Sequence, residues 1–134
     1  MTDAQAVAGR FMQALNERDF ETIAQLIDED VALDSLSGQR TIGALPLRMA
    51  VMGYFRHFDE QFADMVIMHD ALGQRAAVDV TARGRYRETF PGMVEASDQS
   101  YSIPSVFVFE IEGGLVTRLT HYRNQRIFEQ QLNR

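Results

Sequence analysis

Residues 99–123 read QSYSIPSVFVFEIEGGLVTRLTHYR, and this stretch decides the fold. Polar and apolar side chains alternate along residues 99–112 and again along residues 115–123, which is typical of strands with one buried face. Between them lies the pair Gly113-Gly114, a signal for a tight turn. The stretch therefore predicts an antiparallel hairpin of two long strands.

The same period of two extends toward the N-terminus of this hairpin. Residues 65–72 and 75–88 are predicted strands, joined by the turn signal Gly73-Gln74. The sequence Phe90-Pro91-Gly92-Met93 breaks the pattern before the hairpin, and residues 125–132 are predicted to form a terminal helix after it. We therefore expect an antiparallel meander across the second half of the chain.

The first half of the chain shows helical periodicity instead. Asp3 and Asp19 are candidate N-caps of two helices, and Pro46 suits the first turn of a third. A short strand is expected over residues 31–36 and a loop over residues 38–43. The apolar positions that recur at helical spacing are Ala4, Val7, Phe11 and Leu15 in the first helix, Phe20, Ile23 and Ile27 in the second, and Val51, Phe55, Phe58 and Phe62 in the third.

Helices that precede an antiparallel sheet define an α+β architecture. The third helix is the most apolar, so we expect it to lie between a strongly bent sheet and the other helices. The open end of a sheet that wraps a helix in this way is a natural place for a ligand pocket. Val78, Val80 and Ala82 alternate with charged positions and are expected to form an apolar patch on the outer face. The length of 134 residues fits one domain, residues 1–134.

Composition argues against several classes of function. The formal net charge is −6, which disfavours nucleic acid as a partner. Arg83, Arg85 and Arg87 are expected on a face that is solvated or at the rim of a dimer and paired with acids, with an anion-binding surface as the alternative. The chain has no Cys, and its three His residues show no metal-site spacing. No stretch approaches the ~18 apolar residues of a membrane span, and residues 1–5 are unlike a signal peptide, so we expect no membrane contact and a cytoplasmic protein.

Four segments carry a family resemblance that covers nearly the whole chain. They are residues 11–20 (FMQALNERDF), residues 31–34 (VALD) followed by Gly43, residues 90–104, and residues 109–116 (FEIEGGLV). In this order they resemble the nuclear-transport-factor-2-like proteins, in particular the SnoaL-like and ketosteroid-isomerase-like members. The resemblance implies a cystatin-like cone, in which a curved sheet wraps three helices around an internal pocket, and often a homodimer. It implies no single reaction, because members include isomerases, cyclases, dehydratases, epoxide hydrolases and binding modules.

Two site patterns of the family can be carried onto this chain. In the ketosteroid isomerases the general-base Asp lies nine residues before the loop Gly, as Asp34 lies before Gly43. Their two oxyanion donors fall on Phe11 and near Phe107, which cannot donate a hydrogen bond, so we do not expect steroid isomerase activity. In SnoaL-like cyclases a catalytic acid lies about seven residues after the turn Gly, and this position is His121.

Strand alternation places Leu119, His121 and Arg123 on one face, and the resemblance makes that face the pocket lining. We therefore expect His121 as a base or hydrogen-bond partner beside the general base Asp34, with Arg123 as an anion clamp and Tyr101 as a donor. The other expected ligand-binding residues are Ser105 and the apolar walls Phe11, Phe55, Phe107 and Phe109. Neither a metal nor a cofactor is expected.

Each polar candidate also has a structural interpretation. Asp34 at a strand end is often a turn or cap residue, His121 is more often a hydrogen-bonded core histidine, and Arg123 can pair with a surface carboxylate. Three functions therefore stay open. They are a cofactor-free isomerase, cyclase or lyase acting on a small apolar carbonyl compound, a non-catalytic protein that binds a small hydrophobic molecule, and a dimerisation or scaffolding module.

Overall fold

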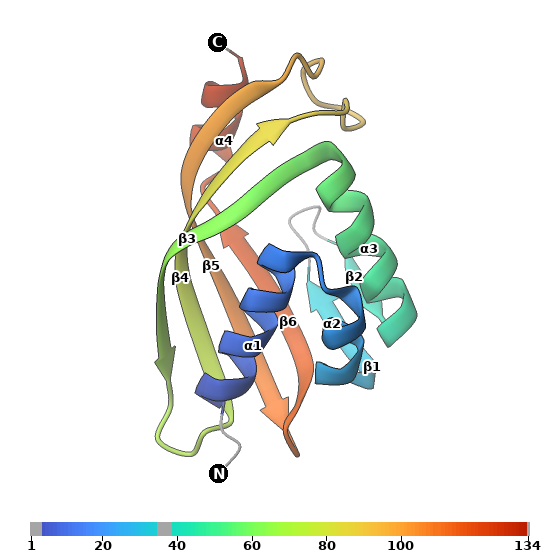
Figure 1. Ribbon diagram of the computed structural model, residues 1–134, viewed down its shortest axis with the longest axis vertical. Coiled ribbons are helices and arrows are strands. Elements are labelled where there is room, and N and C mark those ends of the chain that lie inside the picture. The colour runs from blue at the N-terminus through green and yellow to red at the C-terminus, as the bar shows by residue number, and fades with distance from the viewer. Residues whose placement is uncertain (1–3, 35–38, 134) are drawn as a thin grey trace.

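The computed structural model describes residues 4–34 and 39–133, and Figure 1 shows a long curled sheet with helices on its open side. The helices are α1 (Ala4–Glu17), α2 (Phe20–Leu26), α3 (Ala44–His57) and α4 (Gln125–Leu132), and the strands are β1 (Ile27–Asp34), β2 (Arg40–Ile42), β3 (Phe58–His69), β4 (Arg75–Tyr86), β5 (Gln99–Glu112) and β6 (Leu115–Arg123). This is the α+β cone with a strongly curved sheet that the sequence predicted. In the described part of the chain, no helix is both long and apolar enough to cross a membrane.

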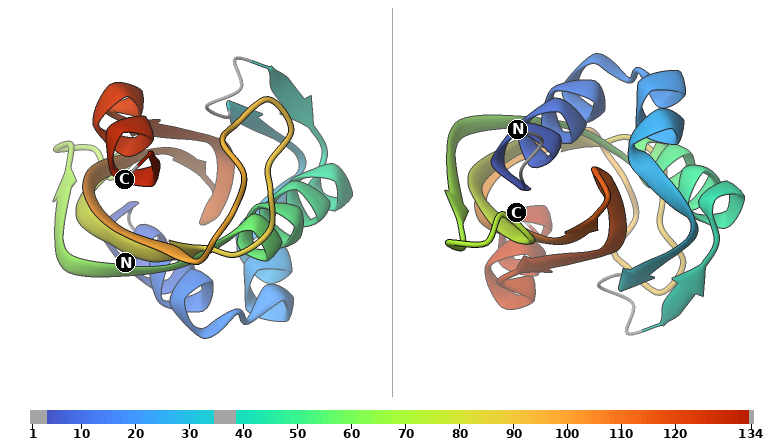
Figure 2. Two further views of the ribbon diagram at one scale, coloured as in Figure 1. Left: turned by 90° about the horizontal axis from the view of Figure 1, so that it is seen from above. Right: turned by 90° about the horizontal axis from the view of Figure 1, so that it is seen from below.

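Within the described residues, six strands form one sheet in the order β2-β1-β6-β5-β4-β3. Strands β3 to β6 make the antiparallel meander, whereas β1 pairs parallel with β6 and antiparallel with β2. The register shifts between Ala63 and Val66 in β3 and between Glu110 and Ile111 in β5, and such bulges bend and twist a strand. Seen from either end, the sheet curls into an arc, and α1, α2 and α3 lie along its open side (Figure 2).

Several local predictions are confirmed. Strands β5 and β6 and helix α4 have the predicted bounds, because a regular period along a whole segment is a strong local signal. Asp19 caps α2, since its Oδ1 accepts a hydrogen bond from the backbone N–H of Thr22 at 3.1 Å. The predicted cap Asp3, the predicted strand residues 35–36 and Gly38 of the predicted loop lie outside the described residues.

Strands β1 and β2 differ from the prediction. β1 begins at Ile27, which was expected on the second helix, and includes the acidic residues 28–30, which remain partly or fully exposed. β2 occupies residues 40–42 of the expected loop and pairs with the end of β1. A strand of three residues carries too short a pattern to be predicted from periodicity.

The boundary between α3 and β3 also corrects the prediction. The apolar stripe predicts a helix through Phe62, but β3 begins at Phe58. Phe58, Glu60 and Phe62 are buried whereas Asp59 and Gln61 are exposed, which is the alternation of a strand. A spacing of four between two phenylalanines fits a helix and a strand equally, and pairing with β4 decides between them.

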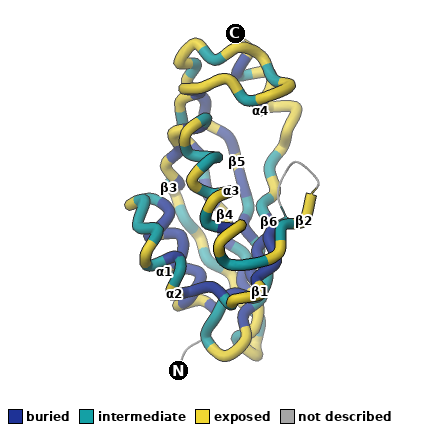
Figure 3. Tube along the Cα trace, turned by 90° about the vertical axis from the view of Figure 1, so that its right-hand side faces the viewer, coloured by how far each residue is buried: buried dark blue, intermediate teal, exposed yellow. Residues whose placement is uncertain are grey.

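Helix α3 is not the central helix that its apolar content predicted. Leu47 is its buried residue, while Leu45 and Met49 are 63% and 65% exposed. Figure 3 shows the same contrast, because α1 has a buried face and α3 is mostly intermediate or exposed. Helix α1 takes the central place, where Phe11 and Leu15 pack against the inner face of the sheet. Helix α3 is left as one side of the pocket.

The inner face of β4 is apolar and buried. Val78, Val80 and Ala82 are at most 2% exposed and belong to the core. The predicted outer patch at these residues is therefore wrong. Successive strand residues face opposite ways, so the outer face of β4 carries the side chains that lie between them.

Candidate functional site

A cavity of about 480 Å³ lies between α3 and the inner face of the sheet. This volume is in the range of small-molecule sites in proteins. Aromatic rings form much of the wall, and no lining side chain in the described residues is an Asp or Glu. The aromatic and basic lining residues are Phe11, Tyr54, Phe55, His57, Phe58, Phe62, Phe90, Phe107, His121 and Arg123.

His121 lines this cavity and carries a ring nitrogen that has no hydrogen-bond partner among the described residues. It lies on β6 opposite Phe107, and the two rings stack with centroids 4.1 Å apart and planes 5° apart. Its Nε2 atom is buried and has no hydrogen-bond partner in residues 4–34 and 39–133. Burial, and then the charge of Arg123, lowers the pKa of His121 to about 3, so the imidazole is neutral at physiological pH. In the Nδ1–H tautomer, a neutral imidazole can accept a proton from a ligand at Nε2.

Arg123 lies two residues further along β6 and lines the cavity on the same face. Its guanidinium carbon is 3.9 Å from the centroid of the Phe128 ring, which is a close cation–π contact. Its Nη1 donates to the Tyr54 hydroxyl at 2.7 Å and its Nε donates to Gln125 at 3.1 Å. These contacts hold a positive charge at one end of an otherwise apolar cavity.

Sequence reasoning missed a buried carboxylate behind this end of the cavity. Glu60 is fully buried on β3, and its Oε2 accepts hydrogen bonds from the hydroxyls of Tyr54 and Tyr101, each at 2.5 Å. Burial raises the pKa of Glu60, while the two hydroxyls and the charges of Arg123 and Arg18 act in the opposite direction. The signal available in the sequence was the alternation of Phe58, Glu60 and Phe62, which the helix assignment concealed.

Asp34 does not meet His121 in the cavity, which corrects the expected pair of bases. Its carboxylate accepts from Arg40 Nε at 2.7 Å and Nη2 at 2.9 Å, and from the Thr120 hydroxyl at 3.2 Å. The bond from Arg40 lowers the pKa of Asp34 to about 2. Its neighbour Leu33 lines the cavity instead, because adjacent strand residues face opposite sides of the sheet. Asp34 therefore acts as an anchor for β2 on the outer face.

The predicted wall residues are only partly brought together. Phe11, Phe55 and Phe107 line the cavity. Phe109 lies behind this wall, edge-to-face with Phe11 at a centroid distance of 5.3 Å. Ser105 is buried, and its Oγ has no partner in the described structure. The hydroxyl of Tyr101 is directed at Glu60 and not at the cavity.

His57 is a second histidine of the cavity wall and lies at the end of α3. Its Nδ1 lies 2.9 Å from the carbonyl oxygen of Glu88, and its ring contacts that of Phe90 with centroids 5.1 Å apart. In the described ranges, no three His, Asp or Glu side chains come together as a metal-ligand set.

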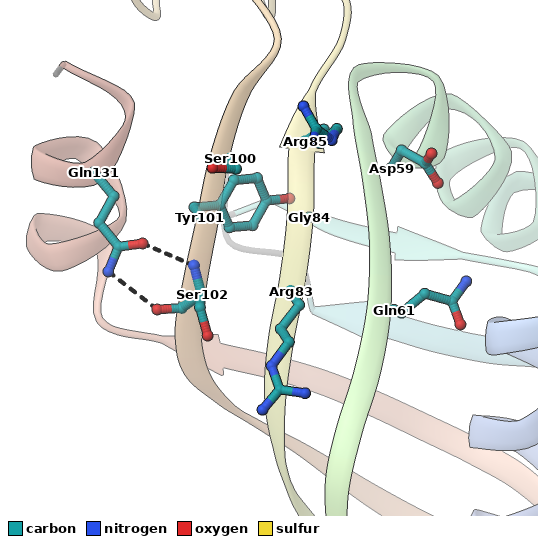
Figure 4. Close-up of a pocket in the computed structure, with 9 residues that line it drawn as sticks. All are labelled: Asp59, Gln61, Arg83, Gly84, Arg85, Ser100, Tyr101, Ser102 and Gln131. Carbon is teal, nitrogen blue, oxygen red and sulfur yellow. Dashed lines mark hydrogen bonds between the residues drawn. The ribbon is translucent and has the colours of Figure 1, made fainter.

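A second hollow, of about 760 Å³, lies on the outer face of β3, β4 and β5 (Figure 4). Gln131 of α4 borders it, accepting from the backbone N–H of Ser102 at 2.8 Å and donating to its carbonyl at 3.0 Å. Arg83 and Arg85 of β4 and Arg87, just after this strand, are paired with acids, as the sequence predicted. The distances are 3.1 Å from Arg83 to Asp64, 2.9 Å from Arg85 to Asp98 and 3.5 Å from Arg87 to Asp98. We assign no ligand to this polar surface.

With the fold and the cavity described, comparison with known proteins identifies the family. The SnoaL-like domain matches residues 8–119, from α1 to the middle of β6. The chain therefore belongs to the SnoaL-like domain family. A search of curated proteins found no match.

Solved bacterial structures share the whole fold. A "putative polyketide cyclase" of Pseudomonas putida KT2440 is 30% identical, with 98% of this chain and 99% of that chain covered and a TM-score of 0.94. A protein with the same description from Silicibacter sp. TM1040 is 29% identical, with 98% of this chain and 96% of that chain covered and a TM-score of 0.92. Another, from Xanthomonas campestris pv. campestris, is 27% identical, with 96% of each chain covered and a TM-score of 0.91. A Mycobacterium tuberculosis epoxide hydrolase at 17% identity, with coverages of 97% and 89% and a TM-score of 0.74, shares the fold alone.

Proposed function

We propose that this protein is a cofactor-free isomerase, cyclase or lyase that acts on a small, largely apolar carbonyl compound. The observation that carries the proposal is the imidazole of His121 on the wall of an aromatic cavity, with an Nε2 that has no hydrogen-bond partner among the described residues. The three similar structures described as polyketide cyclases support a substrate with carbonyl groups. An apolar cavity with few, well-placed polar groups is typical of a site that binds such a molecule.

The proposed chemistry is a proton transfer next to a carbonyl group. His121 Nε2 takes a proton from the carbon beside the carbonyl, which leaves an imidazolium and an enolate. The guanidinium of Arg123, two residues along the same strand face, stabilises the enolate oxygen. Return of the proton from the imidazolium to another atom gives isomerisation. Attack by the enolate carbon on a second carbonyl group, whose oxygen takes the proton from the imidazolium, gives ring closure. Loss of a leaving group from the β-carbon, which departs with the proton of the imidazolium, gives elimination. No metal or redox step is needed for any of these outcomes.

A non-catalytic binding protein is the second candidate, and the same histidine favours it. A pKa of about 3 makes the free His121 a weak base. The enolate that forms beside the imidazolium raises that pKa in the transition state, because an opposite charge nearby stabilises the protonated form. If this rise in the pKa of His121 is large enough for the imidazole to take the proton, the protein is a catalyst. If it is not, the protein only binds its ligand.

Deuterium exchange tests the proposal without knowledge of the natural substrate. The wild type is expected to speed the exchange of the α-protons of 2-tetralone or 2-acetonaphthone in D₂O, followed by proton NMR. His121→Gln removes the base, so we expect exchange about 100-fold slower. His57→Gln makes the same change elsewhere in the cavity, and Asp34→Asn changes the base first expected; both should keep the wild-type rate within a few-fold.

The outcomes of this experiment are distinct. Ligand-induced stabilisation without exchange favours the binding protein, because bound ligand stabilises the fold whether or not it reacts. If no ketone stabilises the protein and no ketone exchanges its α-protons faster in its presence, the proposed function is contradicted. Loss of exchange in Asp34→Asn would instead show that Asp34 takes part in the reaction.

We also propose a homodimer, as the family resemblance implies. Val66 and Met68 of β3 are 56% and 50% exposed and give the outer face of the sheet apolar area that a second copy would cover. Sedimentation equilibrium is expected to give twice the 15.2 kDa chain mass. A single species at the chain mass at all concentrations contradicts the dimer.

A further inference from the structure

Glu60 is an acid that the proposed reaction does not use. It is fully buried and does not line the cavity. Its Oε2 accepts from both Tyr54 and Tyr101 at 2.5 Å, while its Oε1 has no partner in the described structure. A buried carboxyl oxygen without a partner is costly, so this arrangement calls for an explanation.

A chain of hydrogen bonds connects Glu60 to the cavity. Arg123 Nη1 donates to the Tyr54 hydroxyl at 2.7 Å, and a guanidinium can only donate. The single proton of the Tyr54 hydroxyl is therefore directed at Glu60. Tyr54 accepts from the cation and donates to the acid, which fixes the orientation of the guanidinium at the cavity wall.

Four groups around Glu60 favour its charged form and oppose the effect of burial, which raises the pKa of this carboxyl. Two hydroxyl protons point at one carboxyl oxygen, and the cation of Arg123 lies one hydroxyl away. Arg18 donates from Nη2 to the backbone carbonyl of Glu60 at 2.6 Å, which brings a second guanidinium close. A carboxylate with these neighbours supplies the countercharge of Arg123 inside the protein, where little water screens either charge.

We propose that Glu60 is a positioning and specificity-determining residue of this cavity. It holds Arg123 through Tyr54 and offsets its positive charge, so that the cavity selects a neutral carbonyl compound over a carboxylate of the same shape. The inference rests on the proposed function, because it concerns the ligand of the same cavity.

Two nearly isosteric probes test this selectivity. The Kd of 2-acetonaphthone and of 2-naphthoate is measured at pH 8 by NMR titration for the wild type, Glu60→Gln and Tyr101→Phe. The wild type is expected to bind the ketone more tightly. Glu60→Gln keeps an acceptor oxygen for both tyrosines but removes the charge, so we expect the preference to shift toward naphthoate by about tenfold. Tyr101→Phe removes a hydrogen bond to the same oxygen and leaves the charge, so the preference should not change.

The ratio of the two affinities separates a charge effect from structural damage, because a damaged cavity weakens both ligands. An unchanged ratio in Glu60→Gln overturns this inference alone, whereas a wild type that binds neither probe contradicts the proposed function and this inference with it. A measurement on the wild type covers the case in which the variant does not fold. The ¹³C shift of the Glu60 carboxyl at pH 8 is expected to be that of an ionised group, and the shift of a neutral acid overturns the inference.

Discussion

A Gly84→Ala variant is expected to lose about 3 kcal/mol of its free energy of unfolding, or to fail to fold. A Cβ atom at this position would lie 2.5 Å from the Tyr101 hydroxyl oxygen and 2.8 Å from Glu60 Cγ. Gly84 pairs with Glu60 on one side and with Tyr101 on the other, so it leaves the space through which these two side chains meet. A methyl group there separates the buried acid from its donor, which adds an electrostatic cost to the steric one. Urea unfolding followed by circular dichroism measures the loss.

Gly53→Ala is the matched control for this substitution. Apart from its chain neighbours and the backbone of its own helix, no described atom lies within 4 Å of a Cβ at Gly53, which is inside α3. Alanine favours a helix interior over glycine, so we expect a gain of up to about 1 kcal/mol. Equal stability of Gly84→Ala and the wild type would contradict the close packing of Tyr101 over Gly84.

Most of the meander could be predicted, because β4, β5 and β6 each carry their own signal. Alternation along β5 and β6, with Gly113 and Gly114 at positive φ between them, is local information that no distant residue has to supply. The position of α1 and α3 is not local. Both helices are apolar, and only the assembled sheet decides that α1 covers the centre while α3 stays half exposed.

The candidate site could be predicted only where the phase of a strand was clear. Leu119, His121 and Arg123 share one face of β6 as expected, because the hairpin fixes which residues alternate inward. Asp34 shows the opposite case. A count along a family pattern gives its position in the chain but not its face, and a shift of one residue in a strand reverses the face. Leu33 faces the cavity, and Asp34 binds Arg40 on the other side.

Glu60 was not recognised as an internal residue, because the helix assignment concealed its alternation with Phe58 and Phe62. A charged residue on a strand is assigned by default to the solvent face, and here it lies between two buried phenylalanines. Its partners Tyr54 and Tyr101 come from α3 and β5, so the hydrogen bonds that make its burial tolerable exist only after folding.

Acidification from pH 7.5 to pH 5 is expected to cost the wild type about 2 kcal/mol of unfolding free energy relative to His121→Gln. Burial lowers the pKa of His121 in the folded protein to about 3, from 6.5 as its ordinary value. The unfolded chain therefore binds a proton on this imidazole before the folded chain does. The neutral histidine makes its full contribution to the free energy of unfolding above pH 6.5, and this contribution is lost as the pH falls toward 3. Urea unfolding at half-unit steps of pH gives both curves.

The difference between the two curves isolates this one group. Glu60, whose pKa burial raises, responds to pH in both proteins, so its effect cancels in the difference. Asp34, with a pKa lowered to about 2, loses its contribution only as the pH falls below 3.8, outside the measured range. His69→Gln removes an exposed histidine and should follow the wild-type curve. If the wild type and His121→Gln run parallel from pH 7.5 to pH 5, the imidazole is already solvated in the folded protein. Water then reaches the cavity wall at His121, whereas the proposed proton transfer depends on a wall from which water is excluded.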